Sequence, residues 1–243
     1  MKDRKRNLPA SVTARLLNRA RQTGDDYQIL LTNFCFERFL YRLGASTARD
    51  RFVLKGAMLL RVWSDQPYRA TRDLDLLRRG GGPIDTIRTD IQTICNVEVE
   101  QDAVIFDSGS IQVEPIRTGD EYAGTRVILP ASCGTARLRL QIDMGLEDSV
   151  WPPPQPCTYP ALLEFPPPVV LAYPPEAVVA EKLEAVIVHG DRNSRIKDFF
   201  DLQHLASRFR FDRPTLADAV RRSFDRRGTP IPPEEPIGLT PAY

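Results

Sequence analysis

The sequence predicts an α/β protein of the α+β kind, in which helices flank a mixed sheet and a helical lobe follows. Three observations support this class. Apolar residues recur at helical spacing over 11–43, short alternating runs fill 97–145, and helical spacing returns over 174–209. A chain of 243 residues can hold one large domain or a domain with an appended lobe. We expect an α/β domain over 1–160 and a helical domain over 161–243.

Two helices are expected at the N-terminal end, over residues 11–22 and about 25–43. Gly24 separates them, and Gly44 is a candidate C-terminal cap of the second. The stretch "FVLKGAMLLRVW" then predicts a strand, a turn at Gly56 and a helix, and "YRATRDLDLL" predicts a second strand.

The middle of the chain changes to a strand pattern after one further helix, "PIDTIRTDIQTIC". From about Val97 to Gly145, short runs separated by Gly, Asp and Ser predict an antiparallel meander that joins the sheet of "DLDLL". Residues 151–175 are rich in proline, which excludes regular helix, and are expected to form a semi-rigid connection. Two helices follow, "PEAVVAEKLEAVIVHG" and "SRIKDFFDLQHLASRF", before a proline-rich tail that we expect to be loosely ordered.

Composition favours a cytoplasmic protein. Hydrophobic residues make up 42% and charged residues 27%, as in soluble globular proteins, and no apolar stretch approaches the ~18 residues that a membrane helix needs. The four cysteines form no Cys-x-x-Cys pair, so we expect reduced thiols. The net charge of +1 indicates no global basic field, so sequence-specific DNA binding is not expected. P-loop, α/β-hydrolase and zinc-ligand motifs are absent.

Two aspartates in "RDLDLL" are the first candidate functional residues. Alternate residues of a strand share a face, so Asp73 and Asp75 project together while Leu74 and Leu76 face the core. Adjacent carboxylates repel each other unless a cation lies between them, and Mg²⁺ prefers oxygen ligands. The simpler interpretation is an exposed strand face with two solubilising acids.

Further candidates lie on the neighbouring elements. Asp143 shares the polar face of "TARLRLQIDMG", which makes it a candidate third metal ligand if the two strands are adjacent. Gly56 stands between a strand and a helix, where a glycine allows close approach to an anion and Lys55 could add charge. An ordinary strand–helix turn is the alternative there.

A lysine in the first C-terminal helix is the last candidate. Lys182 falls within the apolar arc of its helix, so it must extend outward to solvent or point into an internal polar site. In the next helix Asp198 lies within the apolar arc and Asp201 at its margin. A buried acid and a buried lysine on successive helices suggest a polar site or an ion pair.

Five features follow one another along the chain: Gly56–Ala57, "RDLDLL", Asp143, "AEKLEA" and "RIKDFFDL". In this order they resemble the AbiEii family. Its members are nucleotidyltransferase-like toxins of type IV abortive-infection toxin–antitoxin systems, and they include mycobacterial relatives. The resemblance covers roughly residues 45–210. It implies a DNA-polymerase-β-like nucleotidyltransferase core with a helical C-terminal lobe.

The resemblance also implies roles for individual residues. Asp73 and Asp75 would bind the catalytic Mg²⁺ or Mn²⁺, and the wider superfamily pattern adds Asp143. Lys182 would be a nucleotide-phosphate contact or catalytic residue, and Asp198 catalytic. The remaining nucleotide-binding positions are Lys55, Gly56 and Ala57. The family often has Gly-Ser, Gly-Gly or Gly-Thr where this chain has Gly56–Ala57, so a hydroxyl that could bond phosphate is missing.

Some relatives transfer a nucleotide from an NTP to the 3′ end of tRNA, which halts translation, and are paired with a separately encoded antitoxin. The resemblance therefore implies a Mg²⁺-dependent nucleotidyltransferase toxin with NTP, tRNA and an antitoxin as partners. Two alternatives stay open. The chain could be an NTP-binding regulatory or interaction protein without turnover, or a nucleotidyltransferase that modifies a protein hydroxyl.

Overall fold

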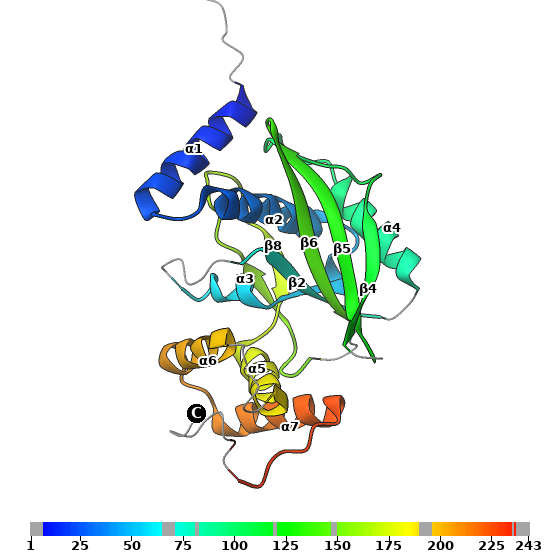
Figure 1. Ribbon diagram of the computed structural model, residues 1–243, viewed down its shortest axis with the longest axis vertical. Helices are drawn as coiled ribbons and strands as arrows, with labels where there is room; N and C mark the ends of the chain where they lie inside the picture. The colour runs from blue at the N-terminus through cyan, green and yellow to red at the C-terminus, as the bar shows by residue number, and fades with distance from the viewer. Residues whose placement is uncertain are drawn as a thin grey trace, which may run out of the picture. The chain divides into compact units, whose positions relative to one another are not determined.

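The computed structural model shows a chain that folds into two compact units (Figure 1). The first comprises Met1–Asp148 and Pro156–Ala172, and the second Ser149–Gln155 and Tyr173–Tyr243. The structure describes residues 7–64, 71–80, 83–118, 121–146, 150–189, 196–234 and 236.

The two expected N-terminal helices are confirmed as α1 (Leu8–Thr23) and α2 (Tyr27–Ala45). Gly24 ends α1 in the left-handed conformation, with φ 75°, and donates its N–H to the Ala20 carbonyl. Helix α2 is buried along most of its length, and its buried residues include the charged Glu37, Arg38 and Arg42. It is the central helix of the first unit.

The expectation that Gly44 caps α2 is wrong, because the helix continues to Ala45 and Ser46 is its C-cap. Gly44 instead allows a close approach between α2 and strand β8 (Val169–Ala172). A Cβ atom added at Gly44 would lie 2.3 Å from the carbonyl oxygen of Val169, well inside van der Waals contact. The absence of a side chain is thus needed for packing and not for a turn.

Gly44→Ala should lower the stability of the protein by about 1–3 kcal/mol, the usual range for overpacking a tight contact. Helix propensity alone favours alanine over glycine by about 1 kcal/mol. A loss of stability in the variant would therefore result from the contact with Val169. A higher urea denaturation midpoint would show instead that β8 can move away from the added methyl group without a loss of stability.

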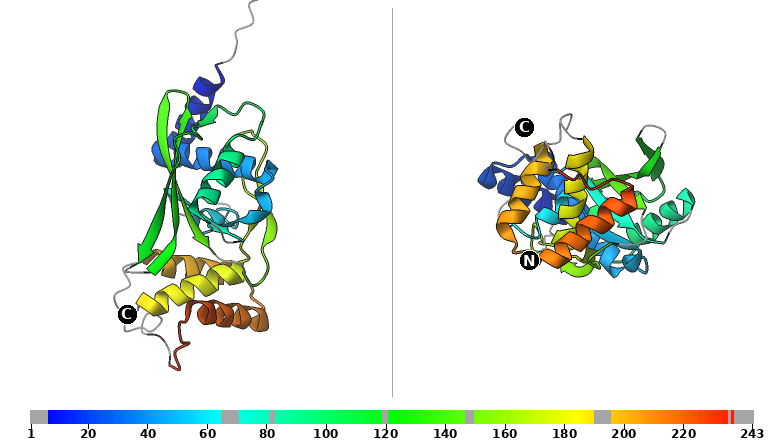
Figure 2. Two further views of the ribbon diagram at one scale, coloured as in Figure 1. Left: turned by 90° about the vertical axis from the view of Figure 1, so that its right-hand side faces the viewer. Right: turned by 90° about the horizontal axis from the view of Figure 1, so that it is seen from below.

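An eight-stranded mixed sheet forms most of the first unit (Figures 1 and 2). Its order is β3-β5-β6-β2-β1-β8-β7, and β4 pairs with β5. The other strands are β1 (Phe52–Lys55), β2 (Asp73–Arg78), β3 (Val104–Phe106), β4 (Gln112–Thr118), β5 (Glu121–Cys133), β6 (Ala136–Leu146) and β7 (Gln155–Thr158). Pairs β2–β6 and β1–β8 are parallel, whereas β1–β2, β3–β5, β4–β5 and β5–β6 are antiparallel. The expected antiparallel meander is therefore confirmed over β4, β5 and β6, and it joins the sheet of "DLDLL" through β6. The first strand expected from about Val97 is limited to β3, which pairs with β5 and not with β4.

The proline-rich segment is not the simple connection expected from its composition, because it contributes β7 and β8 to the sheet. Two buried charged residues of α2 hold the chain between these strands. The Glu37 carboxylate accepts a hydrogen bond of 2.6 Å from the Leu162 N–H, and Arg38 donates one of 2.8 Å to the Pro166 carbonyl. Burial raises the pKa of Glu37, although Arg38 and the Leu162 N–H oppose this shift.

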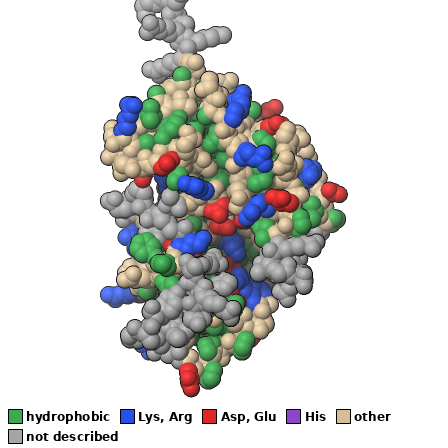
Figure 3. All heavy atoms as spheres, viewed as in Figure 1, with side chains coloured by type: hydrophobic (Ala, Val, Ile, Leu, Met, Phe, Trp, Pro, Cys, Tyr) green, Lys and Arg blue, Asp and Glu red, His purple; other side chains and the backbone are tan. Residues whose placement is uncertain are grey.

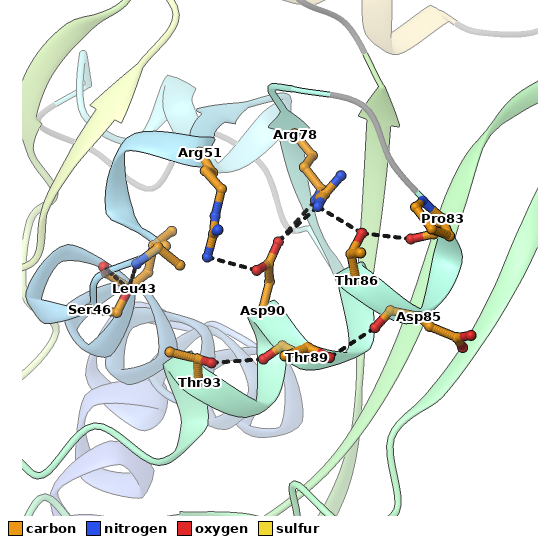
Figure 4. Close-up of polar contacts among 11 residues, drawn as sticks. Leu43, Ser46, Arg51, Arg78, Pro83, Asp85, Thr86, Thr89, Asp90 and Thr93 are labelled. Carbon is orange, nitrogen blue, oxygen red and sulfur yellow. Dashed lines mark hydrogen bonds and ion pairs between the residues drawn. The ribbon is translucent and has the colours of Figure 1, made fainter.

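Helices α2 and α4 (Ile84–Cys95) lie on the same side of the sheet (Figures 1 and 2). At the end of β2, Arg78 donates to Asp90 of α4 at 3.1 Å and to Thr86 at 3.0 Å. Arg51 reaches the other carboxylate oxygen of Asp90 at 2.7 Å, as Figure 4 shows. This cluster ties α4 to the strand that carries the candidate acids. Helix α3 (Ala57–Leu60) is shorter than the predicted one, which extended to Trp63.

Three helices form most of the second unit: α5 (Pro175–His189), α6 (Ile196–Arg208) and α7 (Arg213–Arg227), seen from below in Figure 2. The first two were predicted, and α7 was missed. The sequence signals for α7 lie at its two ends. Asp212 accepts from the Thr215 N–H at the N-terminus, and Gly228 ends the helix with φ 63°. Within the described ranges, no helix has the length and apolarity that a membrane span requires.

The cysteine thiols of the native protein should react slowly with Ellman's reagent at pH 8. Burial raises the pKa of Cys95 to about 12 and that of Cys133 to about 11. It also raises the pKa values of Cys35 and Cys157. Because pH 8 lies below these values, little reactive thiolate is present. All four thiols should react rapidly in urea; equally fast labelling of the native protein would contradict the burial.

Candidate active site

The parallel pairing of β2 with β6 brings the predicted acids together in the first unit. Asp75 lies opposite Asp143, and Asp73 lies opposite Gln141. Residues opposite each other in neighbouring strands point to the same face, and such strands are about 4.8 Å apart. Leu74 and Leu76 occupy the other face and are fully buried. The three aspartates therefore share one polar face of the sheet, as the alternation predicted.

Lys55 and Gly56 lie beside this acidic face. Lys55 is the partner of Asp75 in the antiparallel pair β1–β2. Gly56 has φ 69° and ψ −157°, a conformation that essentially only glycine adopts. A Cβ atom on Gly56 would lie 2.0 Å from Oδ2 of Asp75. The turn therefore needs glycine for its backbone conformation and also because the Asp75 carboxylate fills the adjacent space.

Asp143 has a partner that the sequence analysis missed. Arg126 of β5 donates to both carboxylate oxygens of Asp143, from Nε and from Nη2, at 2.8 Å each. Gln141 donates a further bond of 3.0 Å to Oδ2. The hydrogen bonds to Asp143 raise the pKa of Arg126. Arg126 alternates with the core residues Val127 and Leu129, and this pattern in "GTRVILPA" could have placed it on the polar face.

The two acids of β2 have the better chemistry for a metal ion. Asp73 accepts a 2.6 Å hydrogen bond from Thr71 at Oδ1. Two neighbouring carboxylates suit a Mg²⁺ that takes its other ligands from water and substrate phosphate. No cluster of three or more His, Cys, Asp or Glu residues with metal-binding geometry occurs in the part of the chain that the structure describes. Asp73 and Asp75 are the residues that could hold a cation here, and Asp143 is paired with Arg126.

Lys182 of α5 does not extend to solvent but points into a buried polar site within the second unit. Its Nζ lies 2.9 Å from Asp198 and 2.6 Å from Asp201, both on α6. The side chains of Asp198 and Asp201 are 3% and 0% exposed, and that of Lys182 is 12% exposed. The predicted buried pair is therefore present, and Asp201, placed at the margin of the apolar arc, is a second partner.

The spacing of the two aspartates along α6 explains how both reach the lysine. Asp198 and Asp201 are three residues apart on α6, so they lie on one face and can both reach the same cation. Helix α5 presents Lys182 to that face, while Val178 and Val186, one turn away on either side, are buried. The lysine is thus held in one orientation by two carboxylates, which also offset its positive charge.

The family model described as nucleotidyl transferase AbiEii toxin, type IV toxin–antitoxin system, matches residues 38–242. The crystal structure of JHP933 from Helicobacter pylori is similar with a TM-score of 0.51 at 14% identity, over 76% of this chain and 68% of that one. A candidate nucleotidyltransferase from the same organism also has a TM-score of 0.51, at 15% identity, over 84% of this chain and 79% of that one. These likenesses confirm the expected nucleotidyltransferase-like fold. No curated protein matches the sequence.

Proposed function

We propose that this chain, which belongs to the AbiEii family of nucleotidyltransferase toxins of type IV toxin–antitoxin systems, transfers a nucleoside monophosphate from an NTP to the 3′ end of tRNA and so blocks translation. The observation that carries the proposal is the polar sheet face. On it Asp73 and Asp75 lie side by side with Asp143 across the strand pair, and the Gly56 turn abuts Asp75.

Asp73, Asp75 and the turn beside them have separate roles in the proposal. Asp73 and Asp75 would hold Mg²⁺ or Mn²⁺, which when bound neutralises charge on the triphosphate. The backbone at Gly56–Ala57 would contact phosphate oxygens, and Lys55 would add positive charge beside them. Because α3 has only four residues, its dipole is small, and the backbone N–H groups of the turn would themselves make the phosphate contacts.

Lys182 and Asp198 are assigned to the same reaction by the family resemblance. The geometry within the second unit supports a positioning role for both aspartates, because they fix the ammonium group of Lys182. Lys182 would then be a hydrogen-bonding contact to the transferring phosphate or the departing pyrophosphate. A cytoplasmic location and a separately encoded antitoxin are part of the same proposal.

A protein hydroxyl is the second candidate acceptor, and the charge distribution favours it. The net charge is only +1. On the face seen in Figure 3, basic and acidic side chains are interspersed. Proteins that bind tRNA through its phosphates usually present a clearer excess of positive charge.

The test is to incubate the purified protein with Mg²⁺, total tRNA and each α-³²P-labelled NTP in turn, and to resolve the products on a denaturing gel. Label on tRNA from one NTP, lost with Asp73→Ala, would establish the activity, the nucleotide and the acceptor. Label on a protein band would support the second acceptor. No label with any NTP, from protein that binds NTP in a metal-dependent way, would favour a binding protein without turnover.

A further inference from the structure

The second unit contains a cavity that neither the acidic sheet face nor the Lys182 cluster explains. Its volume is about 310 Å³, and it lies between α5, α7 and the short segment that carries Trp151. This volume is at the lower end of the roughly 300–1,000 Å³ typical of small-molecule sites. The cavity therefore suits a ligand of about the size of one nucleoside rather than an extended chain.

Trp151 and Arg222 form a stacking platform at this cavity. The Arg222 guanidinium lies 4.7 Å from the centroid of the Trp151 ring, and Trp151 as a whole residue is 41% exposed. Asp218 accepts a 2.8 Å hydrogen bond from Nε of Arg222, which restricts the orientation of the guanidinium plane. An exposed indole and an oriented guanidinium are the two kinds of side chain on which nucleic-acid bases stack.

The wall of the cavity combines small apolar side chains with polar groups. Ala177, Ala180 and Ala219 are almost fully buried and leave the space open. Ser223 is 5% exposed, and its hydroxyl has no hydrogen-bond partner in the part of the chain that the structure describes. A buried hydroxyl without a partner is costly, and it could donate to or accept from a ligand.

The charges around the cavity are nearly balanced. Arg222 and Arg226 line it together with Glu181 and Asp225. Arg226 lies 3.7 Å from Glu181, and Glu181 also accepts a 3.2 Å hydrogen bond from the Tyr173 hydroxyl. A balanced lining disfavours a polyphosphate but suits an uncharged planar group whose edge carries both donors and acceptors.

We propose that this cavity binds a nucleobase, stacked against Trp151 and Arg222 with its edge toward Ser223. The base could belong to a free nucleotide or to an unpaired nucleotide of an RNA. The site is separate from the Lys182 cluster, because α5 presents Ala177, Ala180 and Glu181 to the cavity while Lys182 pairs with α6. The proposal goes beyond nucleotide transfer and does not require that the protein catalyse it.

Tryptophan fluorescence of the full chain provides a direct test. The sequence has two tryptophans, so Trp63→Phe leaves Trp151 as the single reporter. AMP, CMP, GMP and UMP, and then single-stranded RNA trinucleotides, are titrated to millimolar concentration. Saturable quenching by at least one base is expected, since a stacked base quenches indole emission. No quenching by any of these probes would overturn the proposal.

Two neighbouring arginines supply a matched control. Arg222→Met should weaken binding by about tenfold, because one stacking partner is lost. Arg221→Met removes an equal charge from the same helix at a residue that does not line the cavity, and should change affinity less than about twofold. Ser223→Ala, nearly isosteric, should weaken binding by about two- to tenfold. Equal losses for both arginine variants would show a general attraction to α7 and contradict the stacking site.

The source of the base and the link to catalysis are separated by two further arms. Quenching by mononucleotides at concentrations as low as those needed for trinucleotides assigns the cavity to a free nucleotide, whereas quenching by trinucleotides alone assigns it to RNA. Repeating the titration with Asp75→Asn, in which transfer is expected to fail, should leave the quenching unchanged. If the protein shows saturable quenching at Trp151 but labels no acceptor in the transfer assay, this inference is supported and the proposed transferase function is contradicted.

Discussion

Asp75→Asn is expected to abolish nucleotide transfer, lowering the rate by about a thousandfold or more, while the protein stays folded. The carboxylate lies between Lys55 on one strand and Asp143 on the other, on the polar face of the sheet. The amide has the same shape but cannot supply the negative charge that holds a divalent cation against the triphosphate. Transfer of α-³²P label measures the activity, and urea denaturation followed by circular dichroism measures stability.

Asp143→Asn is the informative comparison. Both oxygens of Asp143 are engaged by Arg126, so this carboxylate balances an arginine in addition to any contact with a metal. We expect its activity loss to be about tenfold, well short of that of Asp75→Asn. An equal loss in both variants would mean that Arg126 releases Asp143 when nucleotide binds. Full activity of Asp75→Asn would show that the acidic face takes no part in the reaction.

Lys182→Met should destabilise the second unit by about 3–5 kcal/mol at neutral pH, the typical cost of removing one partner of a buried ion pair. The change leaves Asp198 and Asp201, 2% and 0% exposed, without the ammonium group that bonds to both. Lys197→Met, an exposed lysine of the same unit, should change stability by less than about 0.5 kcal/mol. Urea denaturation of the two variants tests the difference.

A triple variant separates the structural from the catalytic contribution of this cluster. Replacing Lys182 by Met and both aspartates by Leu removes all the buried charges at once, and such replacements are often neutral or stabilising. We therefore expect stability to return while nucleotide transfer stays lost. Recovery of transfer in the triple variant would show that the cluster serves the fold only.

Local patterns in the sequence determined the main elements and the faces on which the candidate residues lie. Alternation over Asp73–Leu76 placed Asp73 and Asp75 opposite the buried Leu74 and Leu76. Helical spacing placed Lys182 within the apolar arc of α5, and in the structure its side chain is 12% exposed and paired with two acids. These features depend on side-chain directions that repeat every two or 3.6 residues, so neighbours along the chain are enough to predict them.

Tertiary structure alone decided which distant segments meet. The parallel pairing of β2 with β6 sets Asp75 opposite Asp143, and β5 then brings Arg126 to the same carboxylate. Gly24 and Gly44 look alike in the sequence, yet one ends a helix and the other accommodates the backbone of β8. The proline-rich segment became two strands because buried Glu37 and Arg38 bond its backbone and β1 pairs with it. Such contacts depend on which surfaces can be buried together. A local sequence pattern shows which face of an element is apolar, but it does not show which distant segment will pack on that face.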